Sequence, residues 1–326
     1  MVEQEPGRSP ARKRGWFRTG CFGCLGIVIL AVVLPLAWAF IEMARGVPEL
    51  NRETRTASQL LPGGHDSELP ATPPPGSQMA AMAPGRVEVD FSTGEFTIEA
   101  GPPGQPIRVE ADYDTGTYEL VEEYSSQGEL GWTYHVRFRP KVSWLRMLLA
   151  GGQGQENNIT LILPRGVPMS LTGDIGIGES NLDLGGLWLT QVDLGLGIGE
   201  HKVHFDEPLP HPMEELRLSS SIGEVTVGRI GNASPRTVLL EHSLGEVSYD
   251  LRGEWTVDSE VDVACGIGEC KVRLPGSATN VELVRASVTI GEQRAPDRDR
   301  LNQAGPDAPT VRVDATASLG ELVVDD

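Results

Sequence analysis

The stretch Leu194-Gly195-Leu196-Gly197-Ile198-Gly199-Glu200 contains the motif that decides the fold. Its last three residues, a branched aliphatic residue followed by Gly-Glu, occur seven times in the second half of the chain. The copies are Ile177-Gly178-Glu179, Ile198-Gly199-Glu200, Ile222-Gly223-Glu224, Leu244-Gly245-Glu246, Ile267-Gly268-Glu269, Ile290-Gly291-Glu292 and Leu319-Gly320-Glu321. Successive glutamates lie 21, 24, 22, 23, 23 and 29 residues apart. This near-constant period indicates a repeat architecture in which each copy is one structural unit.

Apolar residues alternate with other residues on both sides of each copy. They stand two, four and six positions before the aliphatic residue, as Leu196, Leu194 and Val192 do, and again three and five positions after it. The alternation therefore slips by one residue at each Gly-Glu, which would turn a flat strand to the wrong face unless the chain bends there. Glycine permits such a bend because it accepts positive φ. The expected corners are Gly178, Gly199, Gly223, Gly245, Gly268, Gly291 and Gly320.

The pattern thus predicts that each unit of about 22 residues forms a strand, a bent corner, a second strand and a connection. One unit cannot bury its apolar face alone, whereas stacked units share a continuous core. We therefore predict an all-β fold, a single-layer β-solenoid-like stack. Residues 166–326 form its Gly-Glu repeats, and residues 86–165 form an N-terminal part with the same core. The sequence Phe91-Ser92-Thr93-Gly94-Glu95-Phe96 carries a divergent corner.

The N-terminal region predicts a membrane anchor. Residues 1–20 hold five basic and two acidic side chains, and residues 21–40 contain no charged side chain. A helix over residues 21–42 is long enough to cross a hydrocarbon core of about 30 Å. The basic residues predict a cytoplasmic tail at 1–20 and an extracytoplasmic location for the rest. The alternative is a signal peptide cleaved near Ala37-Trp38-Ala39. Cys21 and Cys24 are interpreted as small residues of the membrane helix.

Residues 43–85 are rich in Pro and Gly and predict an extended linker to the extracytoplasmic domain, 86–326. Within that domain, residues 144–149 are a short apolar stretch, expected either as a loop packed on the domain or as an exposed patch that contacts membrane or partner. The chain has 46 acidic and 27 basic residues and a formal charge of −19. This charge would repel phosphate backbones, so nucleic acid is not an expected partner.

The repeats, the phrase Gly178-Glu179-Ser180-Asn181-Leu182-Asp183-Leu184-Gly185-Gly186-Leu187 and the ending Leu319-Gly320-Glu321-Leu322 resemble toast-rack domains. These belong to the putative-adhesin (DUF4097-like and DUF2154-like) families of bacterial envelope proteins. Glu53-Thr54-Arg55-Thr56 is similar to the lead-in of the family's N-terminal part. The resemblance covers roughly residues 50–326. It implies a β-stack exposed outside a bacterial membrane, in families that have no agreed activity.

The repeat glutamates are the candidate site. In a stack in register, Glu179, Glu200, Glu224, Glu246, Glu269, Glu292 and Glu321 would form a row with a spacing of about 4.8 Å. Such a row could be bridged by calcium, which prefers oxygen ligands. Alternatively, each carboxylate caps backbone amides at its corner or faces water, and no metal or cofactor is required.

Other candidate groups are cysteines and histidines. Cys265 and Cys270 stand two positions before and three after Ile267, so both are expected on the inward face. A bent strand is expected to keep them as two buried thiols, whereas a tight hairpin would allow a disulfide. His201, His204 and His211 are expected at the surface, with His201 and His204 on opposite faces of a strand.

No nucleophile elbow, Walker loop or dinucleotide-binding motif occurs in the sequence. We therefore expect a non-enzymatic, membrane-anchored envelope protein whose β-stack is a binding, scaffold or sensing module for an unknown envelope protein or polymer. The alternative is a carbohydrate-active β-solenoid enzyme, or an adhesin, that acts on envelope polymers. An open last strand at residues 322–324 could also pair with another chain.

Overall fold

The computed structural model describes residues 51–59, 85–126, 131–142, 157–296 and 304–325, and all structural statements refer to these residues. The predicted cytoplasmic tail, membrane helix and most of the linker lie outside them, as do Cys21, Cys24 and residues 144–149. Within the described ranges, no helix has the length and apolar character needed to span a bilayer.

The described chain folds into one sheet of thirteen strands, which confirms the all-β prediction. The strands are β1 (Arg52–Gln59), β2 (Gly85–Ala100), β3 (Ile107–Asp114), β4 (Tyr118–Ser126), β5 (Trp132–Pro140), β6 (Asn158–Leu163), β7 (Met169–Asp183), β8 (Leu189–His204), β9 (Glu215–Gly228), β10 (Thr237–Asp250), β11 (Ser259–Arg273), β12 (Asn280–Arg294) and β13 (Thr310–Asp325). A 3-10 turn, η3 (Ile230–Asn232), lies between β9 and β10.

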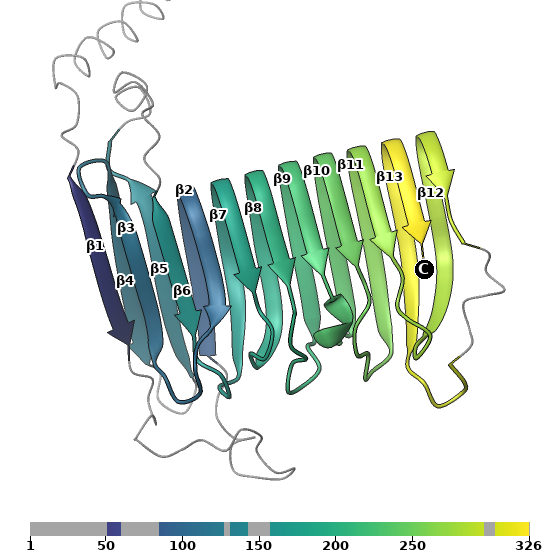
Figure 1. The fold of residues 1–326 in the computed structure, drawn as a ribbon, viewed down its shortest axis with the longest axis horizontal. Helices are drawn as coiled ribbons and strands as arrows, with labels where there is room; N and C mark the ends of the chain where they lie inside the picture. The colour runs from purple at the N-terminus through teal and green to yellow at the C-terminus, as the bar shows by residue number, and fades with distance from the viewer. Residues whose placement is uncertain (1–50, 60–84, 127–130, 143–156, 297–303, 326) are drawn as a thin grey trace, which may run out of the picture. The chain divides into compact units, whose positions relative to one another are not determined.

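Eight long strands, β2 and β7 to β13, each bend sharply near the middle. Each strand rises on one side, turns over and returns on the other, so that it has a first arm and a second arm (Figure 1). The bend lies at a glycine whose φ is between 131° and 155°. We call this row the corner line; it consists of Gly94, Gly178, Gly199, Gly223, Gly245, Gly268, Gly320 and Gly291.

The corner line requires glycine for two reasons. Such φ values are strained for residues with a side chain. In addition, a Cβ at any of the seven repeat glycines would come within 1.8–2.0 Å of the carbonyl oxygen of the corner glycine on the neighbouring strand. The corners therefore stack backbone against backbone, and their close contact fixes the register of the sheet.

Inward side chains from the two arms meet across each bend. In β2 the rings of Phe91 and Phe96 stack with their centroids 4.8 Å apart. In β11 the Cα atoms of Cys265 and Cys270 are 6.4 Å apart. Both pairs stand three positions before and two positions after the corner glycine. The predicted single layer is thus one hydrogen-bonded sheet, but it is folded in two along the corner line, and the core lies between its arms.

The long strands are all parallel, and their corner glycines are in register; the register shifts only at Met169/Ser170 between β7 and β8 and at Leu283/Arg285 between β12 and β13 among the described pairs. Gly223, for example, lies opposite Gly199 of β8 on one side and Gly245 of β10 on the other. The order at the C-terminal end is β11-β13-β12, so β13 lies between two strands that precede it in sequence. The prediction of an open last strand at residues 322–324 is therefore wrong, because β12 is the edge strand. The connection over residues 295–309 is long enough to carry the chain back past β12 to β11.

The N-terminal end of the sheet is built differently. β5 pairs with Gly85–Phe91 of β2 and β6 pairs with Glu95–Ala100, so together they occupy the place of one long strand. β5 and β6 are separated in sequence by residues 141–157, of which 143–156 lie outside the described residues. β4 pairs antiparallel with β5, β3 pairs antiparallel with β6, and β1 pairs antiparallel with β3.

β1 corrects the expectation of a linker over all of residues 43–85, since residues 52–59 form a strand. This strand has no apolar alternation, and polar contacts help to hold it on β3. Arg52 forms an ion pair with Asp112 at 2.8 Å, and the Asn51 amide donates a hydrogen bond to Asp114 at 2.7 Å. A search for period-two hydrophobicity cannot detect such a strand.

Candidate functional site

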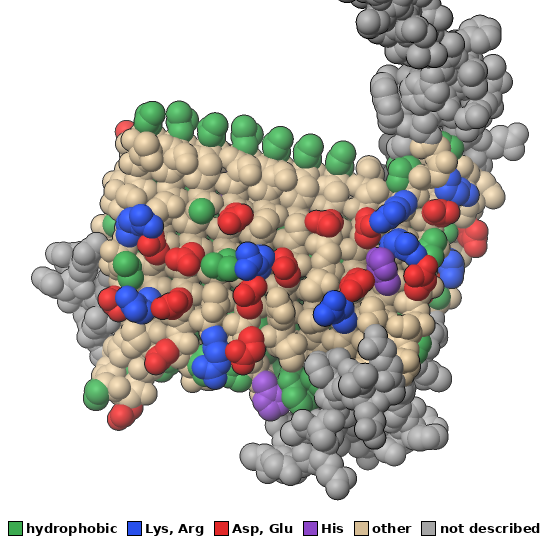
Figure 2. Space-filling model, turned by 180° about the vertical axis from the view of Figure 1, so that it is seen from behind, with side chains coloured by type: hydrophobic (Ala, Val, Ile, Leu, Met, Phe, Trp, Pro, Cys, Tyr) green, Lys and Arg blue, Asp and Glu red, His purple; other side chains and the backbone are tan. Residues whose placement is uncertain are grey.

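Seven aliphatic side chains stand in single file beside the corner line and point into solvent. Each is between 45% and 64% exposed. Figure 2 shows them as a row of green side chains along one edge of the stack. We call this row the aliphatic ridge; in spatial order it consists of Ile177, Ile198, Ile222, Leu244, Ile267, Leu319 and Ile290.

The outward direction of the ridge was not evident from the sequence. Ile198 continues the alternation of Leu194 and Leu196, both buried, and yet it is 46% exposed. The next buried residue after it is His201. The slip in the alternation therefore begins before the aliphatic residue, which occupies the apex of the bend. Counted from the aliphatic residue, the buried residues at −2 and +3 show that the alternation shifts somewhere between them. Hydrophobic periodicity does not decide whether the shift comes before or after the aliphatic residue.

A second row lies on the second arm, two residues beyond the ridge. We call it the glutamate row; in spatial order it consists of Glu95, Glu179, Glu200, Glu224, Glu246, Glu269, Glu321 and Glu292. All seven repeat glutamates are in it, and Glu95 of the divergent corner extends it by one strand. Neighbouring strands in a sheet are about 4.8 Å apart, so the row is a closely spaced line of negative charge.

Basic side chains neutralise part of this charge. Among the described residues, three ion pairs with Lys or Arg involve the row: Lys202 with Glu200 at 2.5 Å, Lys271 with Glu269 at 2.7 Å, and Arg294 with Glu321 at 3.5 Å. The hydrogen bond to Glu200 raises the pKa of the Lys202 ammonium, and the charges of Glu200, Glu224 and Glu179 add to this effect. Several carboxylates of the row thus stabilise the charged form of one lysine together.

The geometry bears on the calcium hypothesis. Within the described ranges, Asp183, His204 and Asp206 are the one group of three or more possible metal ligands whose atoms lie within 4.8 Å of one another. The glutamate row is not such a group, because its carboxylates stand side by side along the stack instead of converging on one point. The glutamates therefore do not form a closed coordination shell among the described residues.

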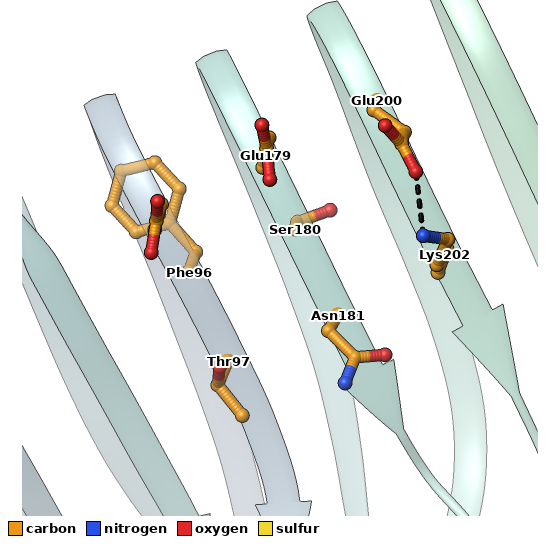
Figure 3. Close-up of a pocket in the computed structure, with 8 residues that line it drawn as sticks. Phe96, Thr97, Glu179, Ser180, Asn181, Glu200 and Lys202 are labelled. Carbon is orange, nitrogen blue, oxygen red and sulfur yellow. Dashed lines mark ion pairs between the residues drawn. The ribbon is translucent and has the colours of Figure 1, made fainter. Parts of the chain in front are cut away.

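A shallow hollow opens on the second arms of β2, β7 and β8. It is lined by three carboxylates of the glutamate row, Glu95, Glu179 and Glu200, and by Lys202. Figure 3 shows the Glu200–Lys202 ion pair on β8, with Glu179 on the neighbouring strand. Carboxylates and a lysine thus share one surface, which is the residue combination that the enzyme alternative requires.

The cysteines differ from the expectation of free thiols, because Cys265 and Cys270 form a disulfide. The prediction assumed that only a hairpin brings two such residues together. The bend at Gly268 is sharp enough to do so within one strand, because it places their Cα atoms 6.4 Å apart, inside the range of about 7 Å that a disulfide allows.

The histidines are only partly at the surface. His201 and His204 do lie on opposite faces of β8, but His201 is buried, with its Nδ1 2.9 Å from Ser180 Oγ. His242, which the sequence did not single out, forms the same buried pair with Ser220 at 2.7 Å. Burial lowers the pKa of both imidazoles. His211 packs its ring against Trp188.

Comparison with protein-family models finds one described as the N-terminal domain of toast_rack, DUF2154, which matches residues 78–228. Residues 78–228 belong to the toast-rack family. The resemblance seen in the sequence is thereby confirmed, and the match spans β2 to β9 of the toast-rack sheet. No curated protein matches the sequence.

Solved structures that align with the chain include a putative cell adhesion protein from Clostridium sporogenes. It has 14% identity and a TM-score of 0.40, over 85% of this chain and 99% of that one. Two putative adhesins from Parabacteroides also align. The protein from P. merdae has 8% identity and a TM-score of 0.25, over 84% of this chain and 96% of that one. The protein from P. distasonis has 10% identity and a TM-score of 0.22, over 85% and 98%.

Proposed function

We propose that this protein is a non-enzymatic, membrane-anchored envelope protein whose toast-rack domain is a binding and scaffold module. The observation that supports this proposal is the pair of rows at the corner line. Each repeat contributes one half-exposed aliphatic side chain and one glutamate, so the stack builds a continuous linear contact surface. Exposed apolar surface of this extent on a soluble domain is typical of interaction sites.

The rigidity of the surface fits a scaffold. The positions of the two rows follow from the backbone register, and that register is fixed by glycines in direct contact across neighbouring strands. A partner would therefore meet a preformed line of charges and apolar groups, which lowers the cost of ordering on binding. Residues 1–42, with their basic tail and uncharged stretch, are proposed to hold this module at the extracytoplasmic side of a membrane.

Crosslinking in native membranes tests the binding role. The variant E224K/E246K reverses two charges in the middle of the glutamate row, and E254K is a matched control on the exposed loop between β10 and β11. We expect mass spectrometry to identify crosslinked envelope components with the unaltered chain and with E254K, and far less of them with E224K/E246K. Identical crosslinking in all three would contradict a binding role for the corner line.

The hollow over β2, β7 and β8 supports the second candidate, a carbohydrate-active enzyme, because Glu179 and Glu200 lie there beside Lys202. Incubation of the purified chain with cell-envelope glycans distinguishes the two functions. A release of reducing ends that is abolished by E200Q would establish the enzyme and exclude the non-enzymatic role. Intact glycans are the result that we expect.

A further inference from the structure

The aliphatic ridge lies at the same edge of the sheet as the point where the chain enters β1. Arg52, the first residue of β1, pairs with Asp114, and Asp112 of the same strand β3 pairs with Asn158. Asn158 in turn lies opposite Glu95, one residue beyond the corner of β2. The described chain therefore begins at the level of the corner line, at the edge of the sheet that bears the ridge.

The distance from that entry point to the predicted membrane helix is short. Eight residues lie between residue 42 and Asn51, so the two are nine residue steps apart. Even fully extended, these nine steps span about 30 Å. If residues 21–42 cross the membrane, the N-terminal end of the corner line is held within about that distance of the bilayer. The edge nearest the membrane is then the one that bears the aliphatic ridge.

We propose that the toast-rack domain lies edge-on against the bilayer that holds its own anchor, with the aliphatic ridge at the boundary of the acyl chains and the glutamate row among ammonium-bearing headgroups. This inference rests on the proposed function, since it requires the anchor. It names the phospholipid surface as the occupant of the ridge.

The dimensions of the two rows fit a bilayer interface. Interfacial amphipathic elements bury their apolar side chains about 5–10 Å deep. The glutamates follow the ridge by two residues, which along a strand is about 7 Å. Side chains of the ridge at the acyl boundary therefore place the carboxylates at headgroup depth, where the ammonium groups of phosphatidylethanolamine are their natural counter-ions.

Side chains next to the ridge do not obstruct this approach. The residue that precedes each aliphatic side chain is Gly, Ser or Thr. Figure 2 shows a band without charged side chains below the ridge. In spatial order these residues are Gly176, Gly197, Ser221, Ser243, Gly266, Ser318 and Thr289. Among the described residues, the ridge can thus enter an interface without bringing charged groups of the first arm with it.

A second copy of the chain fits the ridge less well. A stable protein interface uses about 20–30 residues from each partner, whereas the ridge offers seven in single file. Pairing two ridges would also bring two glutamate rows close together, and like charges at such an interface repel each other. A bilayer requires no matching shape, and each zwitterionic phosphatidylethanolamine headgroup offers an ammonium group that can turn toward the carboxylates while its phosphate turns away.

Photo-crosslinking of the full chain in vesicles tests the proposal. Benzoylphenylalanine replaces Ile222 on the ridge or, as a matched control on the same strand, the exposed Thr226. A further probe replaces Leu244. The vesicles contain phosphatidylethanolamine with a minor share of phosphatidylglycerol. We expect roughly tenfold more lipid adduct from both ridge positions than from Thr226, because only the ridge enters the interface.

The anchor is examined separately by alkaline carbonate extraction of the same vesicles. If the chain is extracted, the proposed anchor fails. If the chain is retained but lipid adducts are equally frequent at Ile222 and Thr226, or absent from both, the ridge proposal is overturned while the anchor stands. An adduct between the ridge probes and a second copy of the chain would also overturn it, in favour of a dimer.

Discussion

Replacing a corner glycine by alanine should strongly destabilise the sheet. In G223A, the new Cβ would lie 2.0 Å from the carbonyl oxygen of Gly199, and the residue would have to keep a φ of 131°. The backbone conformation alone costs about 1–3 kcal/mol for a residue with a side chain. Relief of the contact would require β8 and β9 to separate, with a loss of ladder hydrogen bonds. We therefore expect the free energy of unfolding to fall by about 3–5 kcal/mol.

The measurement is urea unfolding of the full chain in detergent, followed by far-ultraviolet circular dichroism. G276A provides the control, because a Cβ at Gly276 meets no atom within 4 Å and its φ lies outside the left-handed range. Its free energy of unfolding should change by no more than about 0.5 kcal/mol. If G223A is as stable as G276A, the corners are not in the close backbone contact on which the register depends.

Three further predictions concern the core and the ridge. The variant C265A/C270V lacks the disulfide and should have a free energy of unfolding about 2 kcal/mol lower; the loss is modest because the disulfide closes a short loop. Dithiothreitol should lower the thermal unfolding temperature of the unaltered chain but not that of the variant. The buried His242 has a lowered pKa, so the unfolded chain takes up its proton first as the pH falls below about 6.5. The contribution of His242 to the free energy of unfolding should be constant above that pH. Below it, the free energy of unfolding should fall by up to about 1.4 kcal/mol per pH unit for each such histidine. Urea titrations at a series of pH values should show a shallower fall for H242V. I222S should lower the free energy of unfolding by less than about 1 kcal/mol, because the Ile222 side chain is exposed. V225S should lower it by about 2 kcal/mol or more, because Val225 is buried. Equal losses would mean that the ridge belongs to the core.

The repeat period and the corners could be predicted because both follow from local rules. A slip in a period-two pattern at a glycine indicates a bend in any strand, and seven copies at one spacing indicate a stack. The same rules could not show that the bend folds the sheet in two. That depends on how sharply the chain turns, which becomes visible in the contact between Phe91 and Phe96 and in the Cys265–Cys270 disulfide.

The errors have separate physical causes. β1 is held by main-chain pairing and ion pairs, so hydrophobic periodicity does not reveal it. The sequence did not reveal that β13 lies between β11 and β12. Both strands carry the same repeat, with a corner at Gly291 or Gly320, so the apolar pattern does not distinguish their order in the sheet. That order depends on the path of the long connection between them. The ridge was missed because Ile198 is in phase with buried residues on one side of the bend only.

Distances between spin labels test the central claim, that the corners lie in one line in the observed strand order. With the two N-terminal cysteines replaced by serine, a label replaces Glu179 and a second replaces Glu269, Glu321 or Glu292. These positions are four, five and six strands away in the sheet. At about 4.8 Å per strand, double electron–electron resonance should give about 19, 24 and 29 Å, in that order. A shorter distance to Glu292 than to Glu321, or distances that do not increase along the sheet, would contradict the stacked corners.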